Sequence, residues 1–122
     1  MTVFRQEVSV KSVFRVVIIA AAFAVLTAQP ARAQGDAEKG KAVYAAQKCS
    51  MCHSIAGAGG KASALDGVGK KLSTADIHAW IVTPKVMEKK TGSTKKPPMP
   101  DKYGKLPPAD LDALVAYMAS LK

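Results

Sequence analysis

Two cysteines and a histidine stand together near the middle of the chain, in the pattern Cys49-Ser50-Met51-Cys52-His53. A Cys-x-x-Cys-His pattern is typical of covalent haem attachment. On one helical turn, residues three and four positions apart share a face. Cys49 and Cys52 would then each form a thioether with one porphyrin vinyl group, and His53 would bind the iron from the same face. We therefore predict one haem c, held by these three residues.

Other sites use similar residues, and the sequence leaves them open as alternatives. A redox-active disulfide with Cys-x-x-Cys spacing belongs in a βαβ setting, and no strand pattern is visible here. A zinc site needs ligands beyond the motif. A plain structural disulfide is the third alternative. The chain has only two cysteines, and haem attachment is the interpretation that uses both of them together with the adjacent histidine.

A haem iron bound by one histidine has an open position, which a methionine thioether can close. Met99 is our candidate, because residues 97–100 read Pro-Pro-Met-Pro, a segment with few backbone conformations. This restriction lowers the entropy lost when the sulfur binds. Met87, on a short helical turn, remains the alternative. Met118 fits an apolar helix face, and Met51 is expected to point away from the iron.

The elements expected around the motif are short. A first helix over residues 36–48 would have Asp36 as its N-cap. Residues 56–71 are rich in Gly, Ala, Ser and Lys, and we expect them to form a loop along one edge of the haem. Ser73 opens a second helix with a capping-box pattern. Pro84 ends that helix or begins the next short turn.

The C-terminal third of the chain combines a loop and a last helix. Residues 88–105 are predicted to form the loop, and the helix follows Pro107 and Pro108. Tyr117 is expected to pack against Gly40 of the first helix, Trp80 to pack on the haem, and His78 to lie at the surface. The last helix carries an apolar stripe with helical spacing, namely Leu111, Leu114, Val115, Met118 and Leu121.

The first 33 residues have the composition of a cleaved secretory signal. Basic residues precede an apolar run over residues 16–28, and Ala31-Arg32-Ala33 is a small-x-small cleavage site. The run is shorter than the roughly 20 residues that span a bilayer. We predict export to the periplasm, cleavage after Ala33 and a single domain over residues 34–122, with no stable membrane insertion afterwards. An uncleaved membrane anchor is the alternative.

The chain that remains after cleavage is strongly basic. It has 14 lysines, no arginine and 8 acidic residues, a net charge of +6. Such a charge steers encounter with acidic protein surfaces, so the expected partners are redox proteins with acidic docking surfaces. Nucleic acid is a poor candidate, because there is no arginine for bidentate base or phosphate contacts. We expect a monomer.

The order of these residues resembles the class I cytochrome c family over essentially the whole mature chain. The resemblance rests on the attachment motif, on Met99-Pro100, and on Gly40 and Tyr44 set against Leu114 to Met118 in the last helix. It implies an all-α fold in which about four short helices wrap around one covalent haem c, with His53 and Met99 as iron ligands. Many members have a proline carbonyl that accepts the N–H of the proximal histidine. Here we expect the Ala64 carbonyl to take that role.

Together these features predict a periplasmic carrier of one electron between redox proteins, not an enzyme. Two alternatives remain. In the first, the chain is the haem c subunit of a larger periplasmic oxidoreductase. In the second, it is a peroxidase or ligand-binding haem protein with Met99 off the iron. The sequence names neither the electron donor nor the acceptor.

Overall fold

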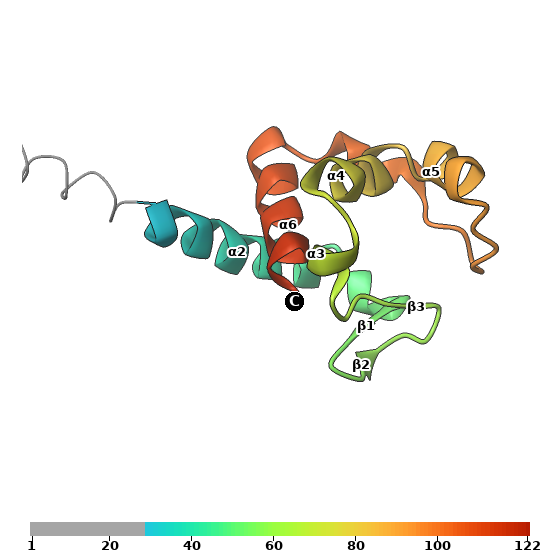
Figure 1. The fold of residues 1–122 in the computed structure, drawn as a ribbon, viewed down its shortest axis with the longest axis horizontal. Coiled ribbons are helices and arrows are strands. Elements are labelled where there is room, and N and C mark those ends of the chain that lie inside the picture. The colour runs from blue at the N-terminus through green and yellow to red at the C-terminus, as the bar shows by residue number, and fades with distance from the viewer. Residues whose placement is uncertain (1–28) are drawn as a thin grey trace, which may run out of the picture. The chain divides into compact units, whose positions relative to one another are not determined.

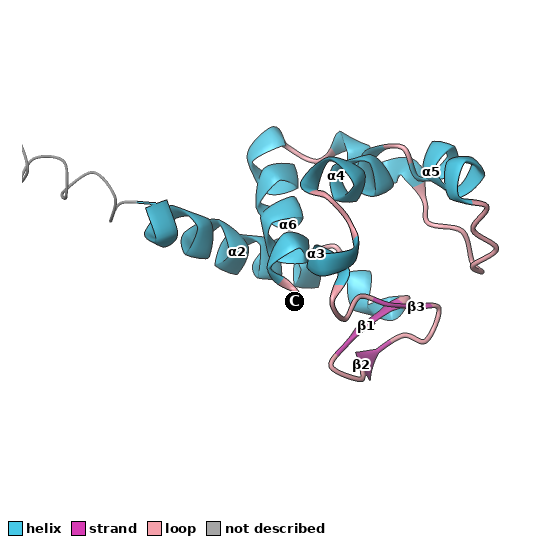
Figure 2. Ribbon diagram, viewed as in Figure 1, coloured by secondary structure: helices cyan, strands magenta, loops and turns pink. Residues whose placement is uncertain are grey.

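The computed structural model describes the backbone of residues 29–122 and the side chains of residues 36–122. The predicted secretory signal therefore lies mostly outside the described residues. Residues Ala33–Lys122 form one compact unit. Among residues 29–122 there are five α-helices, two 3-10 helices and three short strands (Figures 1 and 2). In chain order these are α2 Gln29–Ala46, η1 Cys49–Met51, β1 His53–Ile55, β2 Ala58–Gly59, β3 Ser63–Ala64, α3 Val68–Lys71, α4 Thr74–Val82, α5 Pro84–Thr91, η2 Asp101–Lys105 and α6 Pro108–Ser120.

The first described helix, α2, starts earlier than the sequence predicts. It begins at Gln29, so Asp36 lies inside it and is not its N-cap. Pro30 falls in the first turn, where a missing N–H breaks no helical hydrogen bond, and the alanines that follow favour the helix. The helix ends close to the predicted place, because Lys48 adopts a left-handed conformation with φ of 55°.

Helix α2 packs against α6 through a close approach at Gly40. A Cβ atom at this position would collide with the Ala113 carbonyl oxygen and would lie 2.6 Å from the Cβ of Tyr117. The predicted contact between Gly40 and Tyr117 is therefore confirmed. Next to it, the rings of Tyr44 and Tyr117 meet edge to face, with centroids 5.8 Å apart.

A small sheet replaces much of the loop predicted for residues 56–71. Its strand order is β2-β1-β3, with β1 antiparallel to β2 and parallel to β3. Residues 68–71 form the single turn α3, which packs against α6. The prediction of a loop throughout residues 56–71 is therefore wrong. Strands of two or three residues show no alternation of apolar and polar residues that a sequence could reveal.

The predicted cap of α4 is confirmed. The Ser73 hydroxyl accepts a hydrogen bond from the Asp76 amide at 3.1 Å and donates one to the Asp76 carboxylate at 2.7 Å, and these bonds lower the pKa of that carboxyl. Pro84 begins α5, which runs to Thr91. The predicted loop over residues 88–105 is therefore interrupted by the end of α5 and by η2.

Helix α6 begins at Pro108, as predicted, and packs against α3 and α4. Its apolar stripe faces inward, with Leu114 and Met118 buried. These side chains form one cluster with Val43, Tyr44, Ile77 and Ile81. The fold is mostly helical, as predicted, with one α-helix more than the four expected among the described residues and with the small sheet in addition.

The contact at Gly40 yields a stability prediction. In an open helical position, replacing glycine by alanine stabilises a protein by about 1 kcal/mol. For Gly40→Ala we expect the opposite sign, a loss of about 2 kcal/mol, because the new methyl group collides with the backbone of α6. Urea unfolding of the haem-loaded protein measures the difference.

Ala42→Gly is the matched control, because Ala42 is exposed on the same helix. It should cost about 1 kcal/mol from helix propensity alone. A Gly40→Ala protein more stable than the wild type would show that α2 and α6 are not in close contact.

Candidate functional site

A cavity of about 850 Å³ lies between the helices and the small sheet. Its size is in the range of sites that take drug-sized or cofactor-sized ligands, about 300–1,000 Å³. The attachment motif contributes Cys49, Met51, Cys52 and His53 to the lining, and the loop after α5 contributes Met99. The structure thus brings the predicted cofactor-binding residues, 50 positions apart in the chain, to one cavity.

The attachment motif is not a continuous α-helical turn. Cys49 to Met51 form the 3-10 helix η1, and His53 is the first residue of strand β1. In a 3-10 helix residues three positions apart eclipse each other, and the Cys52 amide donates to the Cys49 carbonyl at 3.2 Å. Both cysteines therefore still face one side, whereas the direction of His53 is set by the sheet.

The two thiols fit attachment better than the alternatives. Cys49 and Cys52 form no disulfide with each other. Burial raises the pKa of the Cys49 thiol more than Lys102 and the local backbone lower it, whereas a redox-active Cys-x-x-Cys pair needs a lowered thiol pKa. No group of three or more His, Cys, Asp or Glu among the described residues is arranged to hold a metal ion, so a zinc site has no support.

His53 is prepared to act as a neutral ligand. Its Nδ1 lies 3.1 Å from the Ser63 carbonyl oxygen. A carbonyl only accepts hydrogen bonds, so Nδ1 carries the proton and Nε2 keeps a free lone pair. Burial lowers the pKa of the imidazole more than the bond to Ser63 raises it. The ring is therefore neutral at pH 7, which is the state that binds a metal.

The carbonyl that orients His53 belongs to Ser63, and the expectation that Ala64 would supply it is wrong. The parallel pairing of β1 with β3 places His53 opposite Ser63 and Ser54 opposite Ala64. The sequence carries no sign of this pairing, because neither segment has a strand pattern. The carbonyl that orients the imidazole thus belongs to a serine held in a strand.

Apolar and aromatic side chains form most of the cavity wall. Trp80 of α4 lines the cavity, so its packing on the haem stays a prediction, and His78 of the same helix is exposed, as predicted. Tyr103 of η2 was not singled out from the sequence; its ring lines the cavity and burial raises the pKa of its hydroxyl. The aliphatic part of the wall comprises Leu65, Val68, Leu72, Ile77, Ile81 and Leu114.

The methionines differ in their access to this cavity. Met99 lines it and is half-buried. Met87 is 5% exposed and is not among the residues that line the cavity, so the geometry favours Met99 over it. Met51 is 74% exposed at the edge of the cavity, and Met118 lines it as part of the packed core.

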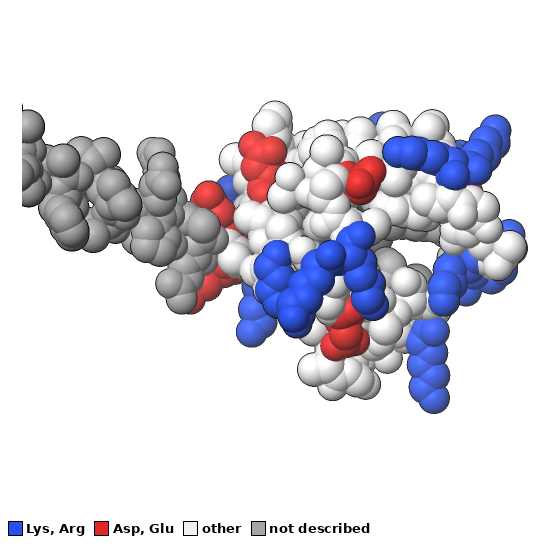
Figure 3. Space-filling view, viewed as in Figure 1, with Lys and Arg blue, Asp and Glu red and all other residues white. Residues whose placement is uncertain are grey.

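Lysines stand at the mouth of the cavity. Lys48, Lys95 and Lys102 are exposed and line it, and Figure 3 shows lysine side chains bordering a hollow on the face that it displays. The ammonium group of Lys102 also lies 5.1 Å from the centre of the Tyr103 ring. Glu88 is the one acidic residue in the lining, so the mouth is predominantly positive.

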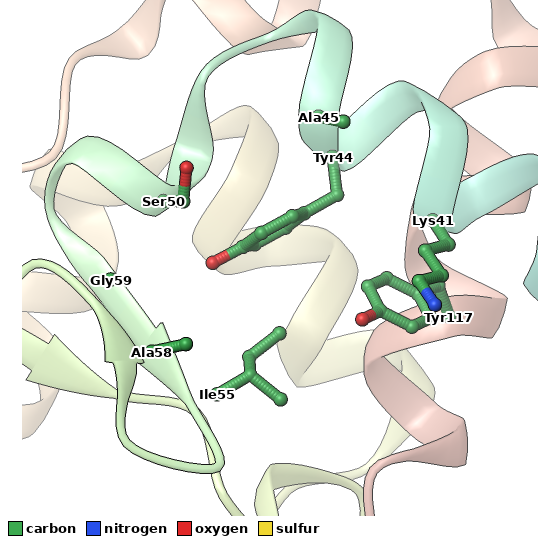
Figure 4. Close-up of a pocket in the computed structure, with 8 residues that line it drawn as sticks. All are labelled: Lys41, Tyr44, Ala45, Ser50, Ile55, Ala58, Gly59 and Tyr117. Carbon is green, nitrogen blue, oxygen red and sulfur yellow. The ribbon is translucent and has the colours of Figure 1, made fainter.

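A second, more open cavity of about 540 Å³ is shown in Figure 4, and Tyr44 lines both this cavity and the first one. The Tyr44 hydroxyl donates a hydrogen bond to the His53 carbonyl oxygen at 3.3 Å. Burial raises the pKa of this phenol, so it keeps its proton at neutral pH. This bond holds the backbone carbonyl of His53, whereas the Ser63 carbonyl holds its ring.

The residues present fit a covalently attached haem. The cavity offers two thiols for thioether bonds, one imidazole nitrogen with a free lone pair, one thioether on a separate loop and an apolar wall. Soft sulfur and imidazole ligands suit iron in a haem. Two closely spaced cysteines followed by a histidine are typical of covalent haem attachment.

The comparisons with known proteins agree with this assignment. The family model described as Cytochrome c matches residues 37–122. No curated protein and no solved structure matches the chain. Among residues 29–122, no helix has the length and apolar character needed to cross a bilayer.

The bond from Tyr44 to the His53 carbonyl yields a prediction with a pH dependence. Tyr44→Phe should lower the free energy of unfolding by about 1 kcal/mol at pH 7, the usual worth of one hydrogen bond. Because the pKa of Tyr44 is raised in the folded state, its contribution is complete at neutral pH and is lost as the pH rises past the ordinary phenol range, about 10. The difference between wild type and variant should therefore shrink in alkali.

Chemical denaturation at several pH values measures this difference. Tyr117→Phe is the matched control, because it removes the hydroxyl of the other ring of the pair, which faces the second cavity (Figure 4). Equal losses in the two variants at all pH values would contradict a specific role for the Tyr44 bond.

Proposed function

This chain belongs to the cytochrome c family, and we propose on that premise that it carries one electron at a time between redox proteins in the periplasm, with His53 and Met99 as the ligands of its haem iron. Proteins of this family carry electrons on haem c. The observation that supports the finer proposal is the shared cavity, which receives His53 from β1 and Met99 from the loop after α5. When bound, the haem supplies an iron that alternates between the ferric and ferrous states.

The protein's own residues determine how the iron is held. The Ser63 carbonyl keeps Nδ1 of His53 protonated, which leaves Nε2 free to bind. Met99 supplies a soft sulfur, which favours the reduced metal and raises the reduction potential. Two protein ligands leave no position for a substrate, which supports an electron carrier over a peroxidase or a ligand-binding protein.

The residues around Met99 hold its loop in place. η2, which follows the loop, packs against α4. An ion pair of 2.9 Å joins Lys85 in the first turn of α5, the helix before the loop, to Asp101 of η2, which follows the loop. Both partners are largely exposed, so this pair contributes little to stability. The apolar contact of Met99 with the core cluster therefore does most to fix the position of its side chain.

The lysines at the cavity mouth support docking of acidic partners. Lys95 and Lys102 lie where the cavity opens to solvent, so an acidic surface attracted to them would approach the site of electron exchange. The attraction accelerates encounter at low salt and weakens as the salt concentration rises. Export by the predicted signal would bring the protein to partners in the periplasm.

Ligation by Met99 is tested by removing the thioether. The reduced Met99→Ala protein should bind carbon monoxide rapidly at neutral pH, whereas the wild type should not. Its reduction potential should fall by roughly 0.1–0.2 V, a fraction of the range of about 0.8 V that axial ligands span. Absorption spectroscopy with a potentiometric titration measures both effects.

Met51→Ala serves as the control, because it removes an exposed thioether from the same cavity edge. It should leave the potential and the carbon monoxide reaction unchanged. Rapid carbon monoxide binding by the wild type would overturn His/Met ligation and favour a ligand-binding haem protein.

Docking at the cavity mouth is tested with small charged oxidants. Lys95→Glu and Lys102→Glu should each slow oxidation by anionic hexacyanoferrate(III) about threefold at low salt and accelerate oxidation by a cationic cobalt(III) complex. Stopped-flow measurements give the rates, and added salt should remove the difference.

Lys41→Glu is the matched control, because it makes the same change in net charge beside the second cavity. If it slows the anionic oxidant as much as the other two variants do, electrons do not leave preferentially at the lysine-rich mouth.

A further inference from the structure

Two chain segments run side by side around His53 and are tied together by successive hydrogen bonds. Residues 52–56 include β1, and residues 62–66 include β3 (Figure 1). The ladder starts at the second cysteine of the attachment motif and ends one residue beyond β1. The Cys52 carbonyl accepts from the amides of Ala62 and Ser63 at 3.1 and 3.3 Å, and the Ser63 carbonyl accepts from Nδ1 of His53 at 3.1 Å. The Ser54 carbonyl accepts from the Leu65 amide at 2.8 Å. Finally, Oδ1 of Asp66 accepts from the Ala56 amide at 2.7 Å.

The last of these bonds differs from the others. It is the shortest, and its acceptor is the side chain of Asp66, whereas the other acceptors are backbone carbonyls. A substitution at position 66 therefore removes this bond alone and leaves the backbone bonds in place. Asp66 does not line the haem cavity, so its effect on the orientation of His53 passes through the segment it holds.

The bond reaches a backbone position that needs support. Ala56 has a φ of 51°, a left-handed conformation that is unfavourable for a residue with a Cβ atom and persists where the surroundings enforce it. The Asp66 carboxylate holds the Ala56 amide in this conformation. On its other side, the Asp66 carbonyl accepts a hydrogen bond from Lys71 of α3 at 3.2 Å, which links the residue to the helical part of the fold.

We propose that Asp66 is a positioning residue for His53. By closing the end of the ladder, it keeps β1 and β3 in register and so keeps the Ser63 carbonyl aligned with Nδ1 of the imidazole. In this chain a side chain and a short parallel pairing together supply the rigidity that a proline would give to the accepting carbonyl. The inference rests on the proposed role of His53 as the iron ligand.

The hydrogen bond at Nδ1 makes the imidazole a stronger electron donor. Electron donation by the imidazole stabilises the ferric state. A loosened Ser63 carbonyl would weaken this donation and would therefore raise the reduction potential. Removal of a nearby negative charge would raise the potential too, so the test separates the bond from the charge. Asp66→Asn removes the charge and keeps an acceptor oxygen for the Ala56 amide, whereas Asp66→Ala removes both.

The experiment compares the haem-loaded wild type with Asp66→Asn, Asp66→Ala and Asp110→Ala. NMR of the reduced proteins measures hydrogen exchange at Nδ1 of His53, and a potentiometric titration measures the potential. In Asp66→Ala the exchange should be about tenfold faster than in Asp66→Asn, the factor expected from loss of one ordinary hydrogen bond, and the potential should be the higher of the two. Asp110→Ala breaks the 2.9 Å ion pair with Lys39 and should leave the exchange unchanged.

Equal exchange rates and potentials in Asp66→Ala and Asp66→Asn would overturn the inference, as would an equally fast exchange in Asp110→Ala. If Asp66→Ala does not fold, the pair is compared in an Ala56→Gly background, where glycine accepts the left-handed conformation without support. There the difference in exchange rate between the two variants should be well below tenfold, and a full tenfold difference would also overturn the inference. A wild-type spectrum without histidine-ligated haem would instead overturn the proposed function, so the two failures are distinguishable.

Discussion

The structure depends on one constraint: a short chain must build an apolar cavity large enough for a cofactor and still hold itself together. Few apolar side chains of the described residues are buried, and most of these belong to α2, α4 and α6. The rest of the apolar surface of these helices lines the cavity. A haem attached there would supply the apolar mass that a domain of this size otherwise lacks. The covalent bonds from Cys49 and Cys52 would make that contribution permanent.

Different elements close the fold and orient His53. The contact of Gly40 with α6 brings the first and last helices together, and Tyr44, one turn further on, forms the wall beside His53. The small sheet then fixes His53 itself, through the Ser63 carbonyl on its ring and the Tyr44 hydroxyl on its backbone. Helix packing thus sets the size of the cavity, and strand pairing sets the direction of the imidazole.

Much of this arrangement could be predicted from the sequence because the signals are local and strong. The attachment motif, the cap at Ser73 and the stripe on α6 each depend on residue type at a short, fixed spacing. The four predicted cofactor-binding residues do line one cavity. Their role as ligands stays a prediction until the haem is observed.

The sheet could not be predicted, because its strands are two or three residues long and its bonds join segments about ten residues apart. The error of one residue between Ala64 and Ser63 follows directly, since only the pairing register decides which carbonyl meets the imidazole. The start of α2 was missed for another reason. Asp36 is a good N-cap, but an acceptable proline and several alanines before it allow the helix to continue toward Gln29.

The central claim is that Cys49, Cys52 and His53 hold one haem in this cavity. The most direct test is the intact mass of the denatured protein after production in an export compartment with haem-attachment machinery, followed by identification of the modified peptide. The account predicts a single haem that survives denaturation, on the peptide that contains both cysteines. A colourless, compactly folded protein with both thiols free would contradict it.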